Sequence, residues 1–91
     1  MRRYAWDRAK SAANALKHGV RFEEALTAFS DTASIDVFDL AHSSEEDRWR
    51  KLGLSDRGRL IVVVYAEAGE NIRIISARVA TRGERTAYED E

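Results

Sequence analysis

The sequence of 91 residues contains no cysteine, no proline and only two histidines, His18 and His42. Without cysteine the chain can form no disulfide, no thiolate metal site and no cysteine nucleophile, and two histidines are too few for a histidine-rich metal cluster. The five glycines form neither a dinucleotide-binding fingerprint nor a phosphate loop, and no serine stands in a Gly-x-Ser-x-Gly elbow. We therefore expect no metal and no cofactor.

Long hydrophobic runs are also lacking, since none approaches the roughly 20 residues that span a bilayer. The first residues lead into Trp6 and Asp7 rather than into the hydrophobic core of a signal peptide. The length fits one small domain over residues 1–91, and a hydrophobic content of 44% is that of a folded chain. We expect a single cytoplasmic domain with no membrane contact.

Charge is nearly balanced overall, with 15 Lys and Arg against 16 Asp and Glu, but it is distributed in blocks. Residues 1–18 carry a net charge of +4 and residues 19–47 a net charge of −7. Such blocks favour a molecule with a basic face for a polyanion and an acidic face for a basic protein. The alternative is that folding intermixes the blocks on the surface.

Two helices are predicted near the N-terminus. Asp7 is a good N-cap, apolar residues follow at helical spacing as far as Leu16, and Gly19 supplies a stop. The second helix covers residues 22–29, with two glutamates in its first turn, where the helix dipole favours negative charge.

Alternating and continuous apolar runs then predict strands over residues 33–38, 48–55, 60–65 and 72–78, and residues 4–6 can add a short one. Thr81 and Glu84 have the spacing of a capping box, which predicts a last helix to Tyr88. The fold class is α+β, with the last three strands in an antiparallel meander and the helices against one face of the sheet.

The chemistry-bearing residues are basic side chains on and around this sheet. They are Arg48, Arg50, Lys51, Arg57, Arg59, Arg73, Arg78, Arg82 and Arg85. Guanidinium groups bind phosphate bidentately and stay charged at any relevant pH. If several converge on one face, they could support cleavage of a phosphate ester by neutralising the charge that builds on it. The alternative is that they only keep the surface soluble.

Strand parity limits this hypothesis. Residues five apart on a regular strand face opposite sides, so Arg73 and Arg78 cannot both line one cleft without a bulge. One of the two is then structural. We favour Arg78 for the site, because it stands where the strand meets the last helix.

RNA cleavage by its own 2′-hydroxyl also needs a base. His18 has a suitable intrinsic pKa, although its place before Gly19 equally suits a histidine bonded to helix-terminal carbonyls. Glu67 could be the base or the partner of an arginine. Aromatic faces on which a base could stack are those of Trp6, Trp49, Tyr65 and Tyr88, of which the two tryptophans are expected in the core.

Several strings in the sequence resemble the BrnT family of type II toxins. The first is Trp6-Asp7-x-x-Lys10, followed by Asn14 and by Lys17-His18-Gly19-Val20-x-Phe22-Glu23-Glu24-Ala25. The likeness continues through His42-Ser43, Glu46, Arg48-Trp49 and Gly53, then Gly58-Arg59-Leu60 and the strand to Tyr65. It closes with Ile72-Arg73-Ile74-Ile75-Ser76-Ala77-Arg78, Ala80-Thr81, Glu84-Arg85 and Tyr88-Glu89. Nearly the whole chain is covered.

The resemblance implies a RelE-like fold and a metal-independent endoribonuclease that inhibits translation. It also implies a BrnA-type antitoxin with a ribbon-helix-helix portion. The toxin would contact operator DNA only through this antitoxin. In such enzymes RNA lies on the sheet beside the last helix, which favours Arg48, Lys51, Arg78 and Arg82 as phosphate ligands. Within this interpretation the catalytic candidates are Arg48, Glu67, Arg78, Arg82 and His18. The RNA-binding candidates are Lys51, Arg59, Arg73, Arg85 and Tyr88.

The chain also departs from the family pattern. Arg8 and Thr32 stand where many relatives carry proline, and Ala66 and Ala68 stand where relatives often carry threonine and arginine. The last two substitutions remove polar side chains near the expected site and could weaken activity.

Two rival hypotheses remain at this point. One is a non-catalytic binding module that acts as co-repressor with a ribbon-helix-helix protein, and the other is a structural domain with scattered charge. If the chain is a toxin, the acidic segment 19–47 would receive a basic antitoxin element while the arginines face RNA.

Overall fold

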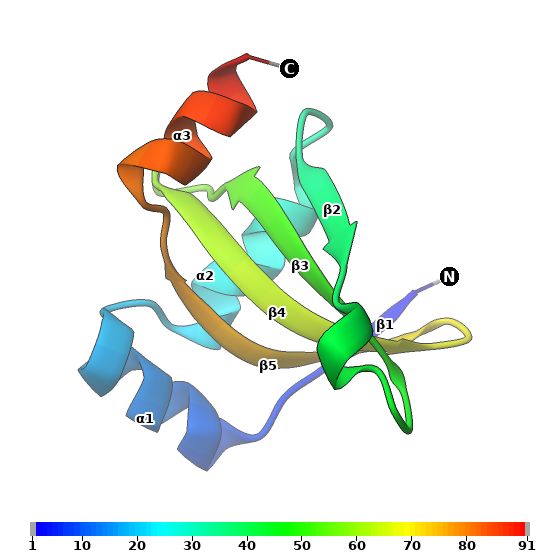
Figure 1. Cartoon of the computed structure of the whole chain (residues 1–91). Coiled ribbons are helices and arrows are strands. Elements are labelled where there is room, and N and C mark those ends of the chain that lie inside the picture. The colour runs from blue at the N-terminus through cyan, green and yellow to red at the C-terminus, as the bar shows by residue number, and fades with distance from the viewer. Residues whose placement is uncertain (1, 91) are drawn as a thin grey trace.

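The computed structural model describes residues 2–90, so residues 1 and 91, the two ends of the predicted domain, lie outside the described residues. These residues form a five-stranded sheet with α helices on both of its faces (Figure 1). The strands are β1 (Arg3–Ala5), β2 (Ile35–Phe38), β3 (Asp47–Leu54), β4 (Leu60–Ala68) and β5 (Asn71–Val79). The helices are α1 (Arg8–His18), α2 (Phe22–Thr27) and α3 (Arg82–Glu89), with 3-10 turns η1 (Ala28–Ser30) and η2 (Leu40–His42).

The strand order in the sheet is β1-β5-β4-β3-β2. Strands β3, β4 and β5 form the predicted antiparallel meander, and β2 pairs antiparallel with β3. The short first strand also forms, but it runs parallel to β5. The sheet is therefore mixed rather than wholly antiparallel, because β1 and β5 are the first and last strands of the chain and no hairpin joins them.

Helices α1 and α2 pack on one face of the sheet and build the core. Its fully covered apolar side chains come from the α1–α2 connection, α2, η1, β4 and β5: Val20, Phe22, Ala25, Ala28, Ile61, Val63, Ile74 and Ala77. The predicted start and stop of α1 are confirmed: Asp7 accepts a hydrogen bond from the Lys10 amide, and Gly19 adopts φ +74°. A left-handed residue at this point suits glycine, so the sequence ends α1 sharply and turns α2 back onto the sheet.

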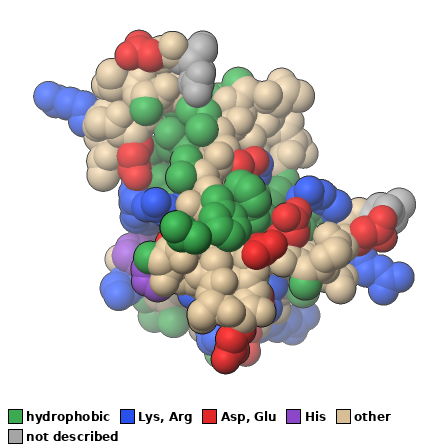
Figure 2. Space-filling view, turned by 45° about the vertical axis from the view of Figure 1, so that its right-hand side comes forward, with side chains coloured by type: hydrophobic (Ala, Val, Ile, Leu, Met, Phe, Trp, Pro, Cys, Tyr) green, Lys and Arg blue, Asp and Glu red, His purple; other side chains and the backbone are tan. Residues whose placement is uncertain are grey.

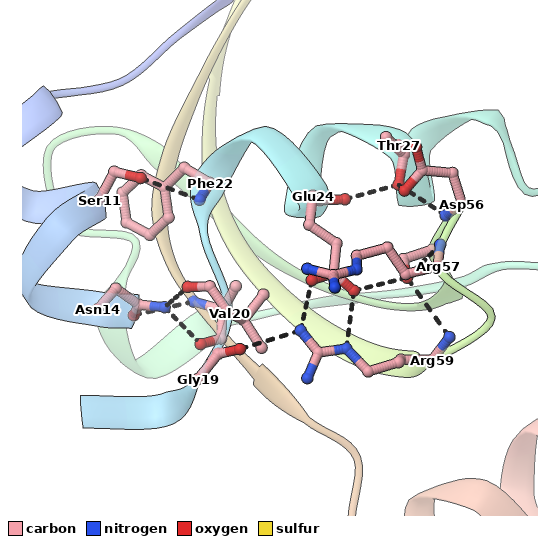
Figure 3. Close-up of polar contacts among 12 residues, drawn as sticks. Ser11, Asn14, Gly19, Val20, Phe22, Glu24, Thr27, Asp56, Arg57 and Arg59 are labelled. Atoms are coloured by element: carbon pink, nitrogen blue, oxygen red, sulfur yellow. Dashed lines mark hydrogen bonds and ion pairs between the residues drawn. The ribbon is translucent and has the colours of Figure 1, made fainter. Parts of the chain in front are cut away.

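The joint between α1 and α2 is held by buried polar side chains (Figure 3). The Asn14 amide donates to the carbonyls of Val20 and Ala77 at 2.8 and 2.7 Å and accepts from the Ala77 amide at 3.2 Å. The Ser11 hydroxyl accepts from the Phe22 amide at 3.0 Å. These bonds connect α1 to α2 and to β5, so the helical layer is fixed to the sheet.

Helix α3 departs from the prediction that all helices cover one face. Its predicted capping box is present, since Thr81 and Glu84 exchange side chain to backbone hydrogen bonds. However, Glu84 and Ala87 line a hollow with side chains of β2, β3 and β4, namely Ile35, Val37, Arg50, Leu52 and Val62. Val62 faces away from the core residues Ile61 and Val63. Helix α3 therefore covers one end of the opposite face (Figure 1).

Candidate functional site

A β-bulge decides which arginines share a face. In the register of β4 and β5, Arg73 lies opposite Ala66 and Arg78 lies opposite Val62, with a register shift at Val64/Tyr65. Ala66 and Val62 are four residues apart on β4 and point to the same side. The bulge therefore corrects the expectation that one of the two arginines must be structural: both project from the face opposite α1 and α2.

Strand β3 adds two more arginines to this face. Arg48 lies opposite Ala66, and Arg50 lies opposite Val64. Four guanidinium groups thus come from two strands that flank β4. We call this surface the arginine face, and it consists of Arg48, Arg50, Arg73 and Arg78.

Glu46, in the loop before β3, lies between two of these arginines. Its carboxylate forms a close ion pair with Arg73, and its Oε1 atom is 3.8 Å from Nη2 of Arg48. Arg48 and Arg73 flank Ala66 from neighbouring strands. A carboxylate between two guanidinium groups occupies the position that suits a phosphate group.

A hollow of about 460 Å³ opens beside this ion pair. It is lined by Arg3, Tyr4, Ala5, Glu46, Ala66, Ala68, Asn71, Ile72 and Arg73. The two alanines that depart from the family pattern thus lie in the wall of the hollow. Larger polar side chains at these positions would project into it.

Arg78 is held by Glu84 of α3. Its Nη1 and Nη2 atoms donate to the two carboxylate oxygens at 2.7 and 2.8 Å. The hydrogen bond from Arg78 lowers the pKa of Glu84 to about 2, and burial opposes this shift only in part. The same hydrogen bond raises the pKa of Arg78. This pair attaches α3 to the sheet and orients one cation of the arginine face.

Arg50 contrasts with its neighbours on the arginine face. Its side chain is exposed, and no hydrogen bond or ion pair joins it to any other residue between 2 and 90. It is therefore available to a ligand without breaking an existing contact.

Lys51, one of the predicted phosphate ligands, points the other way. It lies three residues after Arg48 on a regular strand, so its side chain is on the α1 and α2 side. Its ammonium group bonds to Ser34 and Asp36 at 3.1 Å each and lies 4.9 Å from the ring centre of Phe29. The structure gives Lys51 a buried, packed position away from the other candidates.

Glu67 and Arg59 are also placed apart from the arginine face. Glu67 lies two residues after Tyr65 on β4, on the face covered by α1 and α2, and its carboxylate pairs with Arg2 at 3.0 Å. Arg59 lies at the opposite end of β4 and binds the buried carboxylate of Glu24 and the Gly19 carbonyl (Figure 3). Its hydrogen bond lowers the pKa of Glu24 against the effect of burial.

The remaining candidates lie on helices. His18 is exposed at the end of α1, on the other side of the sheet. Arg82 and Arg85 are exposed on α3, beside the arginine face. The Tyr88 hydroxyl donates to Asp31 at 2.6 Å, which raises the pKa of Tyr88. The structure thus places Arg48, Arg73 and Arg78 on one face of the sheet, with Arg78 opposite Val62 and the other two opposite Ala66, and places His18 on the other face.

Glu46 is a residue of this site to which the sequence alone assigns no role. It lies in an acidic loop, and its charge does not say which arginine it meets. The sequence offers two signals: Glu46 belongs to the strings that resemble the BrnT family, and it stands two residues before Arg48, where alternate residues of an extended segment lie on one side.

Neither a metal cluster nor a membrane-spanning helix occurs in the described part of the chain. Between residues 2 and 90, no three histidine, aspartate or glutamate side chains lie together as a metal site requires. None of the helices in this range is both long and apolar enough to cross a bilayer.

The fold defines a small α+β protein with one mixed sheet and helices on both of its faces. It is similar to the crystal structure of the Brucella abortus ribonuclease toxin BrnT, with a TM-score of 0.64 and 22% sequence identity over 90% of this chain and 100% of that one. No match is found among curated protein sequences.

The family model described as "Ribonuclease toxin, BrnT, of type II toxin-antitoxin system" matches residues 6–84. The chain therefore belongs to the BrnT family of type II toxin–antitoxin systems, as its sequence strings predict. Membership implies an antitoxin partner.

Proposed function

We propose that this chain is a metal-independent endoribonuclease toxin that binds RNA on the arginine face and inhibits translation by cleaving it. The observation that carries the proposal is that Arg48, Arg50, Arg73 and Arg78 share one side of the sheet, which the bulge in β5 makes possible. Family membership supports ribonuclease activity in general. The proposal includes two further expectations from the sequence, namely that the fold is RelE-like and that the toxin acts in the cytoplasm.

In the proposed reaction, a ribose 2′-hydroxyl gives its proton to water and attacks the adjacent phosphorus, and the bond to the 5′-oxygen of the next nucleotide breaks. That oxygen takes a proton from water, so the products are a 2′,3′-cyclic phosphate and a 5′-hydroxyl. Charge builds on the non-bridging phosphate oxygens, and the guanidinium groups of the arginine face neutralise it, with Arg78 held in place by Glu84. Arg82 and Arg85 of α3 would extend the contact along the RNA backbone. His18 and Glu67 lie on the face of the sheet covered by α1 and α2, so we assign them no contact with this phosphate.

Cleavage of RNA by the purified chain tests the proposal. We expect the wild-type chain to cut single-stranded RNA in the presence of a chelator, and the double variant Arg48→Ala, Arg73→Ala to lose about 10²-fold in rate because two phosphate ligands are removed. Lys10→Ala is the matched control, since Lys10 is exposed on α1 on the other side of the sheet. Equal rates for all three proteins would reject the role of the arginine face.

An inactive wild-type chain would instead favour the non-catalytic co-repressor. Growth arrest when the wild-type chain is expressed without antitoxin, together with normal growth on expression of the double variant, would support the ribonuclease toxin. The two assays together separate an enzyme from a binding module.

We further propose that the antitoxin is of the BrnA type, with a ribbon-helix-helix portion through which the complex meets operator DNA. Its docking surface is the edge strand β2 with η2, which we call the β2 edge. Val37 and Leu40 are 50% and 82% exposed there. Figure 2 turns this side of the molecule forward and shows hydrophobic side chains beside acidic ones. A basic segment with apolar side chains fits this surface.

A further inference from the structure

We infer that Arg48 and Arg73 form a specific phosphate subsite for the RNA backbone, and that the Glu46 carboxylate occupies it until a phosphodiester displaces it. The inference rests on the proposed function in one respect, namely that RNA is the ligand. It adds a defined subsite and a residue that competes with the substrate for it.

The first argument is geometric. Arg48 and Arg73 extend from β3 and β5 on either side of Ala66, which is 4% exposed. The Glu46 carboxylate pairs with Arg73 and comes within 3.8 Å of Arg48. Carboxylate and phosphate oxygens make the same charge-assisted hydrogen bonds to guanidinium groups. One can therefore replace the other at this position.

The second argument is that the ion pair is open to exchange. The side chains of Arg73 and Glu46 are 48% and 32% exposed, so water can replace each hydrogen bond as it breaks. Exposed pairs of this kind contribute only about 0–1 kcal/mol. The Arg78–Glu84 pair differs, because Glu84 is also bonded to the Thr81 amide at the start of α3. Glu46 is thus the acidic side chain of the arginine face that can leave without loosening a helix.

The third argument is the adjoining hollow of about 460 Å³. Its wall includes Arg73, Glu46 and the small residues Ala66 and Ala68. A phosphate that takes the place of the carboxylate would have room beside it for the attached nucleotide. The arrangement therefore suits a phosphodiester better than an isolated anion.

The test is binding of a single-stranded RNA whose riboses are 2′-O-methylated, so that the nucleophile is blocked and binding is measured without cleavage. We expect Glu46→Gln to bind this RNA about three- to fivefold more tightly than wild type at low salt. We also expect a steeper salt dependence, by about 0.7 in the slope for each additional phosphate that the protein neutralises. Fluorescence anisotropy at several salt concentrations measures both quantities.

The matched control is Glu45→Gln. Glu45 is the exposed neighbour of Glu46 in the same loop and forms no ion pair among residues 2–90, so its substitution changes the net charge equally. Tighter binding by Glu46→Gln alone supports the inference. Equally tighter binding by both variants, unchanged binding, or weaker binding by Glu46→Gln overturns it.

A second variant removes the subsite itself. In the double variant Glu46→Gln, Arg73→Gln, we expect the increase in affinity to disappear, and its persistence would overturn the inference. If the wild type fails to cut unmodified RNA but these binding results hold, the proposed nuclease fails and the subsite stands. If the wild type cuts RNA and Glu46→Gln binds no better, only the subsite inference fails.

Discussion

At the scale of single residues, Asn14 connects three parts of the chain that are distant in sequence. It bonds to the carbonyl of Val20 after α1 and to both backbone groups of Ala77 in β5. The residue is 8% exposed, so water cannot replace these bonds. Asn14 therefore holds the joint between the helical layer and the sheet.

We expect Asn14→Ala to lower the free energy of unfolding by about 2–3 kcal/mol, because buried backbone groups lose their partners. Urea denaturation monitored by circular dichroism measures the change. Ala12→Ser, at an exposed position on the same helix, is the control and should change the stability by less than about 0.5 kcal/mol. A loss for Asn14→Ala no larger than that of the control would contradict this role.

Ala66 and Ala68 are two further single residues with an effect on the proposed binding surface. Both lie in the wall of the hollow beside Arg73, so larger polar side chains at these positions would enter the space proposed for a nucleotide. The small side chains of Ala66 and Ala68 thus set the size of this hollow.

At the scale of elements, α3 is attached at its two ends by polar contacts, one to β5 and one to the connection between η1 and β2. Arg78 binds Glu84 in its first turn, and the Tyr88 hydroxyl binds Asp31 near its last residue. Apolar contact is limited, because α3 has no fully buried residue. The position of α3 beside the arginine face therefore depends on side-chain ionisation.

This dependence predicts a change of stability with pH. The pKa of Glu84 is about 2 in the folded chain against an ordinary value of 4.5, so the unfolded chain binds the proton first as the pH falls. The stabilisation by Glu84 is therefore complete above pH 4.5 and is lost as the pH falls toward 2. We expect wild type to exceed Glu84→Gln in stability near neutral pH and the difference to shrink as the pH approaches the pKa of the folded chain.

Thermal unfolding of both proteins from neutral pH down to the pKa of folded Glu84 measures this difference. Glu89→Gln, at the exposed end of the same helix, serves as the control and should follow the wild type. A constant difference between wild type and Glu84→Gln over the whole range would show that the ion pair with Arg78 does not stabilise the fold.

At the scale of the whole molecule, the two proposed surfaces lie on different parts of the sheet. The arginine face is centred on β4 and its neighbours, and the β2 edge ends the sheet on one side. RNA and antitoxin can therefore be separated by mutation. An antitoxin bound at the β2 edge would inhibit by covering the adjoining end of the arginine face at Arg50, which pairs with Val37.

We expect Leu40→Lys to weaken antitoxin binding by about tenfold or more, because it removes an apolar contact and repels a basic segment. RNA cleavage by the free toxin should stay unchanged. Leu16→Lys is the matched control, since Leu16 is 91% exposed on α1. Calorimetric titration with the antitoxin measures the affinity. Equal binding by both variants would show that the antitoxin does not dock at the β2 edge.

Much of the fold could be predicted from the sequence because its signals are local. Asp7 and Gly19 delimit α1, Thr81 and Glu84 start α3, and the apolar run from Leu60 indicates the central strand. The parallel pairing of β1 and the side on which α3 lies could not be predicted this way. Both depend on contacts between elements far apart in the sequence.

The sequence by itself determined the order of elements, the meander and the family, because capping, periodicity and characteristic strings are properties of neighbouring residues. Only the tertiary structure decided which charged groups meet. A bulge of one residue brings Arg73 and Arg78 to the same side, and regular alternation sends Lys51 to the other side. Glu46 reaches Arg73 from a separate loop. The faces of a sheet follow parity and register, and register is set by packing across the whole sheet.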